Sequence, residues 1–447
     1  MRIGEVQGNP SSVTARSGAA ASRRVRTLTL TRLLAVALLA CALVPAAAGA
    51  APLRPGFAVS DTPSSTRPHW ACPQGLCDAI VDPRASAAAA PFARAHGHEL
   101  EGSGEEGGYD PEDLRSAYAI PATGGVGQTI ALVEGFGYKQ AEKDLAEYRS
   151  RYGLPPCTSK NGCFTAVSGQ GNSPHYSRAN GWETEEALDL DMASAACPEC
   201  HLLLMDSEGE SWDALSTAVD TAAALGATEI SNSYGLAEET CEAECAEAGP
   251  RYDDHPGVMI TVSSGDEGFD NYLAGAHTAS FPADQPGVVA VGGTSLTRAT
   301  DARGWSESVW GEPKLGLGSG SGCTIDPKPS WQTDLGCAGR TENDVAAVGA
   351  CATPVSVFNS REGGWENVCG TSASSPLVAG IEAHASAFAR SLPGAQSFYE
   401  DPAALFDVTA GKNGKCARRQ RYLCHAQAGY DGPTGNGTPD GPLQLSG

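Results

Sequence analysis

Short apolar runs alternate with amphipathic stretches along the chain from about residue 109 onward. The apolar runs have the length of buried strands, and they cover 128–133, 202–205, 228–233, 258–263 and 288–291. Between them, apolar residues recur at helical spacing over 140–152 and 211–225. Strands that alternate with helices predict an α/β fold of three layers, with a central, mostly parallel sheet and helices on both faces.

Two segments interrupt this alternation. Residues 51–107 are rich in Ala, Pro, Gly and Ser and have no sustained periodicity, which indicates a short propeptide or flexible leader. Residues 305–341 are rich in Gly, Ser and Pro, and we expect a long loop that lies near the functional site. The folded domain is therefore expected to span 108–447.

The first 50 residues have the parts of an export signal. Four arginines between residues 23 and 32 precede the apolar run 33–44, and Ala48-Gly49-Ala50 has the small-x-small form that signal peptidase cuts. A membrane anchor is the alternative, but the run is shorter than the roughly 18 to 20 apolar residues that a span requires. Lipidation at Cys41 is a second alternative, although the apolar run continues past it. We expect a secreted, extracellular protein with no stable membrane association once residues 1–50 are removed.

Loss of residues 1–50 would make an acidic chain more acidic. That segment holds six arginines and one acidic residue, so its removal takes the formal net charge from −23 to −28. Nucleic acid is not an expected partner, because its phosphates would be repelled. An acidic surface keeps a secreted protein soluble, and its self-repulsion falls as carboxylates protonate in an acidic medium. We expect a monomer.

The fourteen cysteines after residue 50 fall into pairs that are close in sequence. Export to an oxidising compartment favours seven short-range disulfides, with the pairs 72/77, 157/163, 197/200, 241/245, 323/337, 351/369 and 416/424. Zinc is the alternative for Cys197, Cys200 and His201. A structural zinc site needs a second pair of ligands, and the sequence contains no other C-x-x-C or H-x-x-H.

Ser372 is the candidate nucleophile. It lies in the segment 370–376, directly before an Ala-rich stretch that runs to Ala389 and is expected to be helical. A serine at a helix start has its hydroxyl at the positive end of the helix dipole, and its backbone N–H can bind a developing oxyanion. An ordinary Ser/Thr helix cap is the alternative. The tripeptide Gly-Thr-Ser recurs at 293–295, where no helix is expected, and we predict a turn there.

Glu185 and Asp189 are the candidate bases for this nucleophile. None of the nine histidines lies in a local pattern typical of a catalytic triad, and four of them stay as alternatives: His175, His201, His255 and His277. Glu185 and Asp189 are four residues apart, on one face of a predicted helix. Like charges at this spacing repel unless they share a proton, and sharing raises one pKa and creates an acid–base pair. A solvated acidic helix face is the alternative.

Asp266 follows the apolar run 258–263. Ligand sites of parallel sheets open at the carboxyl ends of the strands, so this residue is well placed for function. When it is protonated, its carboxyl can donate a hydrogen bond to an oxyanion as an amide does. A simple turn residue is the alternative.

Together these segments resemble the sedolisins, the serine-carboxyl peptidases that share the subtilisin fold. The resemblance extends from about Tyr109 to Pro442, and it is carried in order by the segments 185–191, 265–266, 281–294 and 370–376. It implies that Ser372 is the nucleophile and that Glu185 is the general base and then the acid. It also implies that Asp189 orients Glu185 and shares its proton, and that Asp266 is the oxyanion donor.

The resemblance implies two further sites. Ser233, Tyr234 and Gly235 would form the strand edge that pairs with an extended polypeptide substrate. The family also carries one structural Ca²⁺ near the C-terminus, held by two Asp side chains and backbone carbonyls, and hard oxygen donors suit this ion. In this chain the matching donors are the carboxylates of Asp407 and Asp431 and the carbonyls of Val408, Gln427 and Gly429. Two surface Asp in Gly-rich loops are the alternative.

Three features of the sequence depart from the family pattern. The leader of about 57 residues is far shorter than the folded propeptide that is typical of the family. Cys416 and Cys424 add a bridge inside the calcium region, and Asn436 replaces an apolar residue.

The expected activity is the hydrolysis of peptide bonds through an acyl-enzyme on Ser372. Asp266 must hold a proton to donate while Glu185 must lack one to accept, so activity is expected at acidic pH. Two rivals remain. One is a subtilisin-like serine peptidase with a His base, and the other is a catalytically silent, disulfide-rich secreted binding protein of the same fold.

Overall fold

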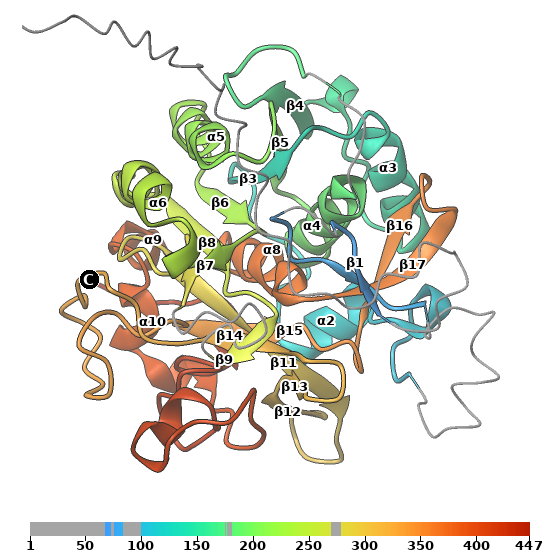
Figure 1. Cartoon of the computed structure of the whole chain (residues 1–447). Coiled ribbons are helices and arrows are strands. Elements are labelled where there is room, and N and C mark those ends of the chain that lie inside the picture. Colours follow the sequence, from blue (N-terminus) through green and yellow to red (C-terminus); the bar gives the residue numbers. More distant parts are fainter. Residues whose placement is uncertain (1–67, 73–75, 84–99, 175, 177–180, 270–278) are drawn as a thin grey trace, which may run out of the picture. The chain divides into compact units, whose positions relative to one another are not determined.

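The computed structural model describes residues 68–72, 76–83, 100–174, 176, 181–269 and 279–447 (Figure 1). The predicted export signal 1–50, Cys41, His175 and His277 lie outside these residues.

A central sheet of eight strands dominates the described part of the chain. Its strand order is β12-β11-β8-β6-β3-β5-β4, and β15 also pairs with β11. The bounds are β3 (Thr129–Gly135), β4 (Phe164–Ser168), β5 (His201–Ser207), β6 (Glu229–Asn232), β8 (Met259–Ser263), β11 (Val289–Arg298), β12 (Trp305–Val309) and β15 (Val345–Val348). Every pairing is parallel except that of β11 with β12. The prediction of a mostly parallel sheet is therefore confirmed.

Alternate side chains of β3 contact helices on opposite faces of the sheet. Leu132 packs in one apolar cluster with Leu190 of α4 (Trp182–Ala196). Its neighbour Val133 packs in another cluster with Leu215 of α5 (Trp212–Ala224). Successive side chains of a strand point to opposite faces, so helices cover both faces as predicted. The other α-helices are α2 (Pro111–Ala117), α3 (Ala141–Arg151), α6 (Glu242–Ala248), α7 (Pro250–Asp253), α8 (Thr371–Glu382), α9 (Ala387–Ser391) and α10 (Gln396–Glu400).

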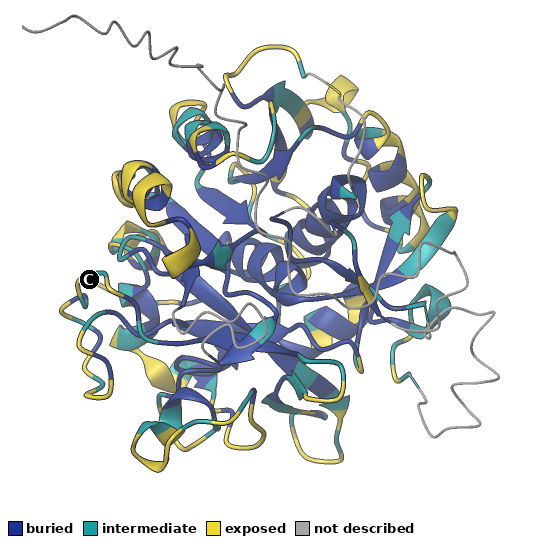
Figure 2. Cartoon of the chain, viewed as in Figure 1, coloured by how far each residue is buried: buried dark blue, intermediate teal, exposed yellow. Residues whose placement is uncertain are grey.

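Two helices, α4 and α8, are buried along their whole length (Figure 2). Pro376 lies inside α8 and has no N–H, so the carbonyl of Ser372 one turn earlier lacks its helical donor. The hydroxyl of Ser233 lies 3.4 Å from this carbonyl. The helix predicted to run to Ala389 is in fact divided, because α8 ends at Glu382 and α9 starts a new helix.

Two expectations about loops are wrong. The segment 305–341 contains β12, β13 (Gly311–Glu312) and β14 (Leu317–Ser321), although it does lie beside Asp266, whose carbonyl accepts a hydrogen bond from Gly318 at 2.9 Å. The tripeptide 293–295 lies inside β11 rather than in a turn. There the hydroxyl of Thr294 binds Glu307 of the neighbouring strand at 2.6 Å, and this pairing keeps the segment extended.

Part of the expected leader 51–107 is ordered. A sheet with the order β1-β2-β17-β16 contains β1 (His69–Trp70) and β2 (Ile80–Val81) beside β17 (Gly364–Cys369) and β16 (Val355–Asn359). These two short strands have no periodicity of their own, and their pairing with β17 defines them. The boundary of the folded domain at residue 108 stays a prediction.

Three smaller sheets contain the remaining strands of the described residues. In the first, β14 pairs with β13 and with β9 (Glu267–Phe269). In the second, β7 (Leu236–Ala237) pairs with β10 (Ser280–Phe281). In the third, β18 (Leu405–Phe406) pairs with β19 (Thr438–Pro439).

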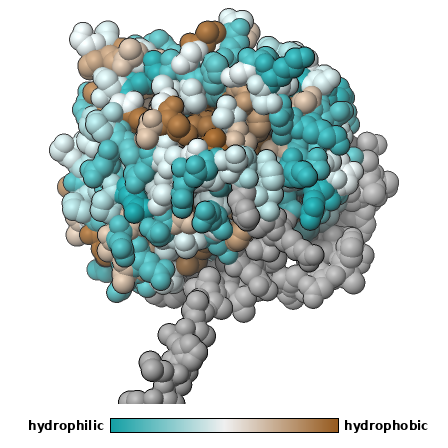
Figure 3. All heavy atoms as spheres, turned by 90° about the horizontal axis from the view of Figure 1, so that it is seen from above, coloured by the Kyte–Doolittle hydropathy of each residue, from teal (hydrophilic) through white to brown (hydrophobic). Residues whose placement is uncertain are grey.

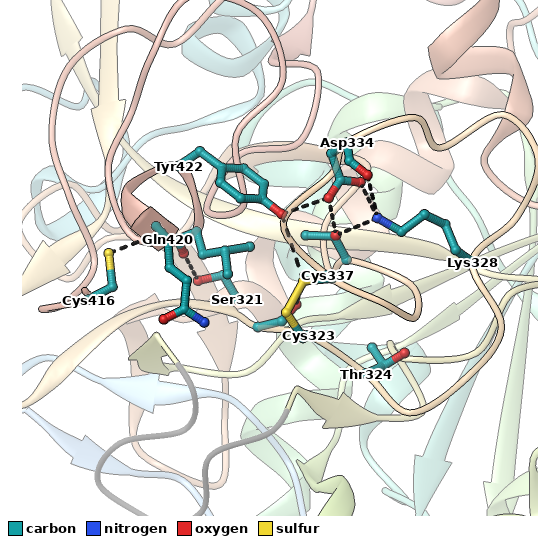
Figure 4. The surroundings of a disulfide bond; sticks show 12 residues. Ser321, Cys323, Thr324, Lys328, Asp334, Cys337, Cys416, Gln420 and Tyr422 are labelled. Carbon is teal, nitrogen blue, oxygen red and sulfur yellow. Dashed lines mark hydrogen bonds and ion pairs between the residues drawn. A yellow bond between two sulfur atoms is a disulfide. The ribbon is translucent and has the colours of Figure 1, made fainter. Parts of the chain in front are cut away.

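All seven predicted disulfides are present. The bond between Cys197 and Cys200 uses both sulfurs that the zinc alternative required. Figure 4 shows the surroundings of the bond between Cys323 and Cys337, where Asp334 accepts hydrogen bonds from Lys328 at 2.8 Å and from Tyr422 at 2.7 Å. Burial raises the pKa of Asp334, but these donors outweigh burial and the pKa is lowered.

The described surface is mainly polar, and Figure 3 shows one face on which apolar side chains gather in small patches. The exposed large apolar residues in the described part are Val126, Tyr176, Leu225, Ile325, Leu335 and Phe388. None of the helices described is both long enough and apolar enough to cross a membrane.

Candidate active site

Ser372 is the second residue of α8, and it is completely buried. Its hydroxyl lies 3.5 Å from the carbonyl of Ser233, to which it donates. The preceding Gly370 has a φ of 122°, and a Cβ there would lie 2.3 Å from the carbonyl oxygen of Asp78 and 2.6 Å from Oδ2 of Asp266. Only glycine fits this position. Because it has no side chain, the carbonyl oxygen of Asp78 and Oδ2 of Asp266 can both lie close to the backbone at the start of α8.

Glu185 and Asp189 project from successive turns of α4, and both are completely buried. Oε2 of Glu185 accepts a hydrogen bond from the backbone nitrogen of Ala79 at 2.7 Å. Burial raises the pKa of Glu185 well above its usual range, and the charge of Asp189 raises it further, while the nearby Ser372 side chain lowers it. The pair therefore has the high proton affinity that general acid–base chemistry requires.

The hydroxyl of Ser233 connects the carboxyl pair to the nucleophile. It donates to Oδ2 of Asp189 at 2.9 Å and lies 3.4 Å from the carbonyl of Ser372. Burial raises the pKa of Asp189, and the hydrogen bond from the Ser233 hydroxyl offsets part of this rise. The net result is a pKa of about 8. Ser233 therefore contributes to the site through its side chain, a role that the sequence did not suggest.

Glu134 is a further buried acid that the sequence analysis missed. It lies near the end of β3. Burial raises its pKa well above the usual range, and the charges of Asp189 and Glu185 raise it further. The sequence does contain a signal for Glu134, because a single acidic residue at the end of an apolar run lies at the end of a buried strand. Glu134 thus extends the carboxyl pair into a buried group of three, since the charges of both Asp189 and Glu185 act on it.

Asp266 follows β8 and faces the start of α8. Its Oδ1 accepts hydrogen bonds from the backbone nitrogen of Thr371 at 2.7 Å and from the Thr371 hydroxyl at 2.8 Å. Its Oδ2 is buried and has no hydrogen-bond partner in the described part of the chain. Burial raises the pKa of Asp266 well above its usual range, and the charges of Asp78 and Glu267 add to this. A protonated Oδ2 would be a free donor beside Ser372.

The predicted substrate edge, residues 233–235, follows β6 and pairs with another segment of this chain. The carbonyl of Ser233 accepts from the nitrogen of Asp78 at 3.2 Å, and the nitrogen of Gly235 donates to the carbonyl of Leu76 at 3.0 Å. The side chain of Tyr234 points elsewhere, because its hydroxyl donates to Asn232 at 2.7 Å inside the core. The edge therefore pairs with polypeptide through its backbone.

The two described histidines among the alternatives lie in other surroundings. His201 is the first residue of β5 and contacts the carbonyl of Gly162 at 2.9 Å. His255 lies 3.1 Å from Asp220 and 2.8 Å from the carbonyl of Arg251. Neither has a contact with Ser372 among the described interactions, whereas the Ser372 side chain acts on the pKa of Glu185.

The predicted calcium ligands converge on one loop. Oδ2 of Asp407 accepts from the nitrogen of Gly429 at 3.0 Å, and Oδ2 of Asp431 accepts from the nitrogen of Gln427 at 2.9 Å. Burial raises the pKa of Asp431 to about 7, and the charge of Asp407 contributes. Val408 is buried next to Asp407. Two carboxylates that repel each other beside a loop of backbone carbonyls fit a hard cation such as Ca²⁺.

A second acidic group lies elsewhere in the described residues. One carboxylate oxygen from each of Glu238, Asp284 and Asp326 lies within 4.8 Å of the others, so the three side chains could hold a metal ion. The sequence analysis did not consider these residues as ligands.

A model of the subtilase family matches residues 189–420, just over half of the chain. The chain belongs to the subtilase family. Two curated proteins are similar to it over about three quarters of its length. Sedolisin from Pseudomonas sp. (strain 101) is 28% identical over 370 residues, which cover 76% of this chain and 61% of the relative. Kumamolisin from Bacillus sp. (strain MN-32) is 31% identical over 355 residues, which cover 74% of this chain and 62% of the relative.

This subtilase spans about three fifths of the length of these two curated relatives. A solved structure of Pseudomonas sedolisin, a serine-carboxyl proteinase complexed with two molecules of pseudo-iodotyrostatin, aligns with a TM-score of 0.65 at 27% identity. That alignment covers 74% of this chain and 95% of the solved chain. The expected resemblance to sedolisins and the subtilisin-like fold are therefore confirmed.

Proposed function

We propose that this subtilase is a secreted serine-carboxyl endopeptidase that acts at acidic pH. One observation carries the proposal: the buried carboxyls of Glu185, Asp189 and Asp266 surround the helix start that holds Ser372. The relatives named sedolisin and kumamolisin support a serine-type peptidase. Polypeptides are the proposed substrates, and the backbone edge at 233–235 supports this because it can pair with any extended chain.

In the proposed reaction, Oγ of Ser372 attacks the carbonyl carbon of a peptide bond and passes its proton to Glu185. Asp189 shares a proton with Glu185, which lets Glu185 change its protonation state without leaving an isolated buried charge. Glu185 then returns the proton to the leaving nitrogen, and an acyl-enzyme remains on Ser372. Water hydrolyses this ester by the same route in reverse.

The oxyanion formed in each step would bind the proton of Asp266 and the backbone N–H of Ser372. A protonated carboxyl can act as such a donor because it needs no rearrangement during the reaction. The hydrogen bonds from Thr371 to Oδ1 of Asp266 support this role, since they leave Oδ2 as the oxygen that carries the proton.

The active form needs a proton on Asp266 and one shared by Glu185 and Asp189. Their raised pKa values extend this form above the range of exposed carboxyls, and rising pH removes both protons. Activity should therefore be highest at acidic pH and fall as the pH rises through neutrality.

We also propose one structural Ca²⁺, held by the carboxylates of Asp407 and Asp431 with the carbonyls of Val408, Gln427 and Gly429. The ion would offset the repulsion between the two carboxylates and fix the loop between them. The seven disulfides support an extracellular location, with residues 1–50 as the export signal, residues 51–107 as the leader and a monomeric product.

The test compares the wild-type protein with Ser372→Ala on an unstructured protein substrate between pH 3 and pH 8. We expect cleavage by the wild type with a maximum at acidic pH, and a loss of at least about 10⁴-fold in the variant. His255→Ala is the control and should retain activity. A maximum at neutral or alkaline pH, or loss of activity in His255→Ala, would contradict the proposal.

A further inference from the structure

Three acidic side chains from separate segments of the chain meet at one cavity. Glu238 directly follows β7, Asp284 lies shortly after β10, and Asp326 lies in the loop that the Cys323–Cys337 disulfide closes. One carboxylate oxygen from each acid lies within 4.8 Å of the others. All three residues line a cavity of about 280 Å³. The fold therefore brings together carboxylates that are distant in sequence.

Asp284 carries a buried oxygen that no group of the protein satisfies. The residue is only 1% exposed. Its Oδ1 accepts a hydrogen bond from Nε2 of Gln285 at 2.9 Å, whereas its Oδ2 has no hydrogen-bond partner in the described part of the chain. Burial raises the pKa of Asp284 well above its usual range, and the charges of Glu238 and Asp326 raise it further. A buried carboxylate oxygen without a donor is costly, and a bound cation would remove this cost.

Gln285 holds two of the three carboxylates in place. Its Nε2 also donates to Oδ2 of Asp326 at 2.8 Å, so each of the two aspartates has one oxygen fixed by the same amide. A Cβ on Gly249 would lie 2.4 Å from Oε1 of Gln285, so glycine makes room for this side chain. Hydrogen bonds that orient the ligating carboxylates are typical of metal sites.

The described residues provide no cation that pairs with this group. None of the ion pairs formed by these residues includes any of the three acids. The charge of Arg340 acts on Asp284 and Asp326, but its guanidinium donates to Oδ1 and Oδ2 of Asp344, at 3.0 and 2.7 Å. A fourth buried acid, Glu342, adds to the repulsion, because the charge of Asp284 raises its pKa. The group therefore has an excess of negative charge.

We propose that this cavity is a second cation site, in which Glu238, Asp284 and Asp326 hold one Ca²⁺. Ca²⁺ binds oxygen atoms at about 2.4 Å, so oxygens that lie within 4.8 Å of one another can contact the same ion. The ion takes about six to eight oxygen ligands, and water that enters the cavity would supply those that the carboxylates do not. The site shares no residue with the calcium site proposed at Asp407 and Asp431.

The ion would join three segments near the predicted substrate edge. β7 follows the edge 233–235 and pairs with β10, and the backbone nitrogen of Glu238 donates to the carbonyl of Ala279 at 3.0 Å. In the disulfide loop, the hydroxyl of Thr324 accepts a hydrogen bond from the backbone nitrogen of Asp326 at 3.1 Å. Figure 4 shows Thr324 beside this disulfide. Bound Ca²⁺ would therefore fix the disulfide loop to the β7–β10 ribbon.

The test uses a host chain that carries Ser372→Ala and Asp431→Asn, which prevent self-digestion and remove the other proposed calcium site. Because water supplies several ligands, we expect a Kd of about 10⁻⁴–10⁻³ M, as in extracellular calcium modules. Isothermal titration calorimetry at pH 7 should show one Ca²⁺ bound to the host. About 10 mM Ca²⁺ should raise the Tm of the host by about 2 °C or more relative to chelator.

Two further substitutions in this host identify the ligands. Asp284→Asn should abolish both the binding of Ca²⁺ and the rise in Tm. Glu242→Gln removes a negative charge from an exposed position on the same cavity, and this control should keep both. Asp326→Asn changes the half-buried ligand and should weaken binding at least tenfold, which gives a second measurement if Asp284→Asn does not fold.

The Tm values in chelator separate a metal ligand from an acid that only supports the fold. Without Ca²⁺, Asp284→Asn removes repulsion among the acids, so its Tm should equal or exceed that of the host. With Ca²⁺ the order should reverse. A Tm that is lower by the same amount in both conditions would make Asp284 a structural residue and overturn the site. The same conclusion would follow if the host bound no Ca²⁺, or if Asp284→Asn and Asp326→Asn bound it as the host does.

Discussion

The backbone nitrogen of Ala79 lies 2.7 Å from Oε2 of Glu185, so this carboxyl contacts a peptide group at the start of α8. Asp189 raises the pKa of Glu185 from one helical turn away, and the Ser372 side chain lies near enough to lower it. A carboxyl in contact with both the nucleophile and a peptide nitrogen can take a proton from one and give it to the other.

Removal of that carboxyl should abolish most of the activity. We expect Glu185→Gln to lower kcat by about 10²- to 10⁴-fold, because the amide cannot accept the Ser372 proton. Glu183→Gln is the matched control on the same helix, since Glu183 pairs with Arg361. Steady-state kinetics on a peptide substrate at acidic pH measure both. Comparable losses in the two variants would mean that α4 has been disturbed generally.

Asp266 should show its role through the difference between two variants. Asp266→Ala removes the oxyanion donor and should lower kcat by about 10²- to 10³-fold. Asp266→Asn can keep the acceptor for Thr371 and place an amide donor at Oδ2, and that donor does not titrate. We expect Asp266→Asn to retain more activity than Asp266→Ala and to lose less of it as the pH rises. Identical pH profiles for the wild type and Asp266→Asn would exclude Asp266 as the group that sets the alkaline limit.

Ser233 is a positioning residue, because its hydroxyl binds Asp189 and the carbonyl of Ser372. Ser233→Ala should lower kcat about tenfold with little change in KM, since the backbone edge is retained. The hydroxyl lowers the pKa of Asp189, so its loss should raise that pKa and move the acidic limb of the kcat profile to higher pH. A change confined to KM would instead assign Ser233 to substrate binding.

Calcium should stabilise the C-terminal region. Addition of a chelator is expected to lower the Tm, and Asp431→Asn should lower the Tm and remove most of the chelator's effect. Asp401→Asn, at an exposed position outside the proposed ligands, is the control. Thermal unfolding followed by circular dichroism measures these changes without relying on activity. A Tm that does not respond to chelator in the wild type would contradict the site.

The buried acids predict that the fold loses stability as the pH rises. Burial raises the pKa of Asp189, Glu366 and Glu382 to about 8 each. A carboxyl whose pKa is higher in the folded state binds more protons when folded, so its contribution is complete below the unfolded pKa near 4 and is lost up to about 8. We expect the Tm to fall by about 5 °C or more between pH 5 and pH 8. A Tm that rises over this range would contradict the burial of these acids.

Local patterns predicted the strands and the disulfides well, because the signals are short in range. The run 128–133 became β3 and the run 258–263 became β8, since apolar side chains must be covered by helices on both faces. Each cysteine pair lies within 18 positions of sequence, so local spacing was enough to predict the partners. The order of Glu185, Asp266 and Ser372 along the chain was also informative through the family resemblance.

Features that depend on contacts between distant segments could not be predicted. β1 and β2 are two residues long, and only their pairing with β17 makes them strands. β14 contains Gly320, which looks like a loop residue, yet a Cβ there would lie 1.8 Å from the carbonyl of Ser264. Glycine is needed for this close approach rather than for flexibility. The contacts of Asp78 with Ser263 and Gly370 could not be predicted for the same reason, because no local pattern connects these residues.

The described disulfides span between 3 and 18 positions of sequence, from Cys197–Cys200 to Cys351–Cys369. Short loops close faster and at lower entropic cost than long ones. Most of these thiols can therefore meet their native partners while the surrounding chain is still unfolded. Cys351 is the exception, because Cys337 is closer to it in sequence than its partner Cys369. Oxidative maturation should reach the correct pattern segment by segment, with little need for an isomerase to rearrange wrong bonds.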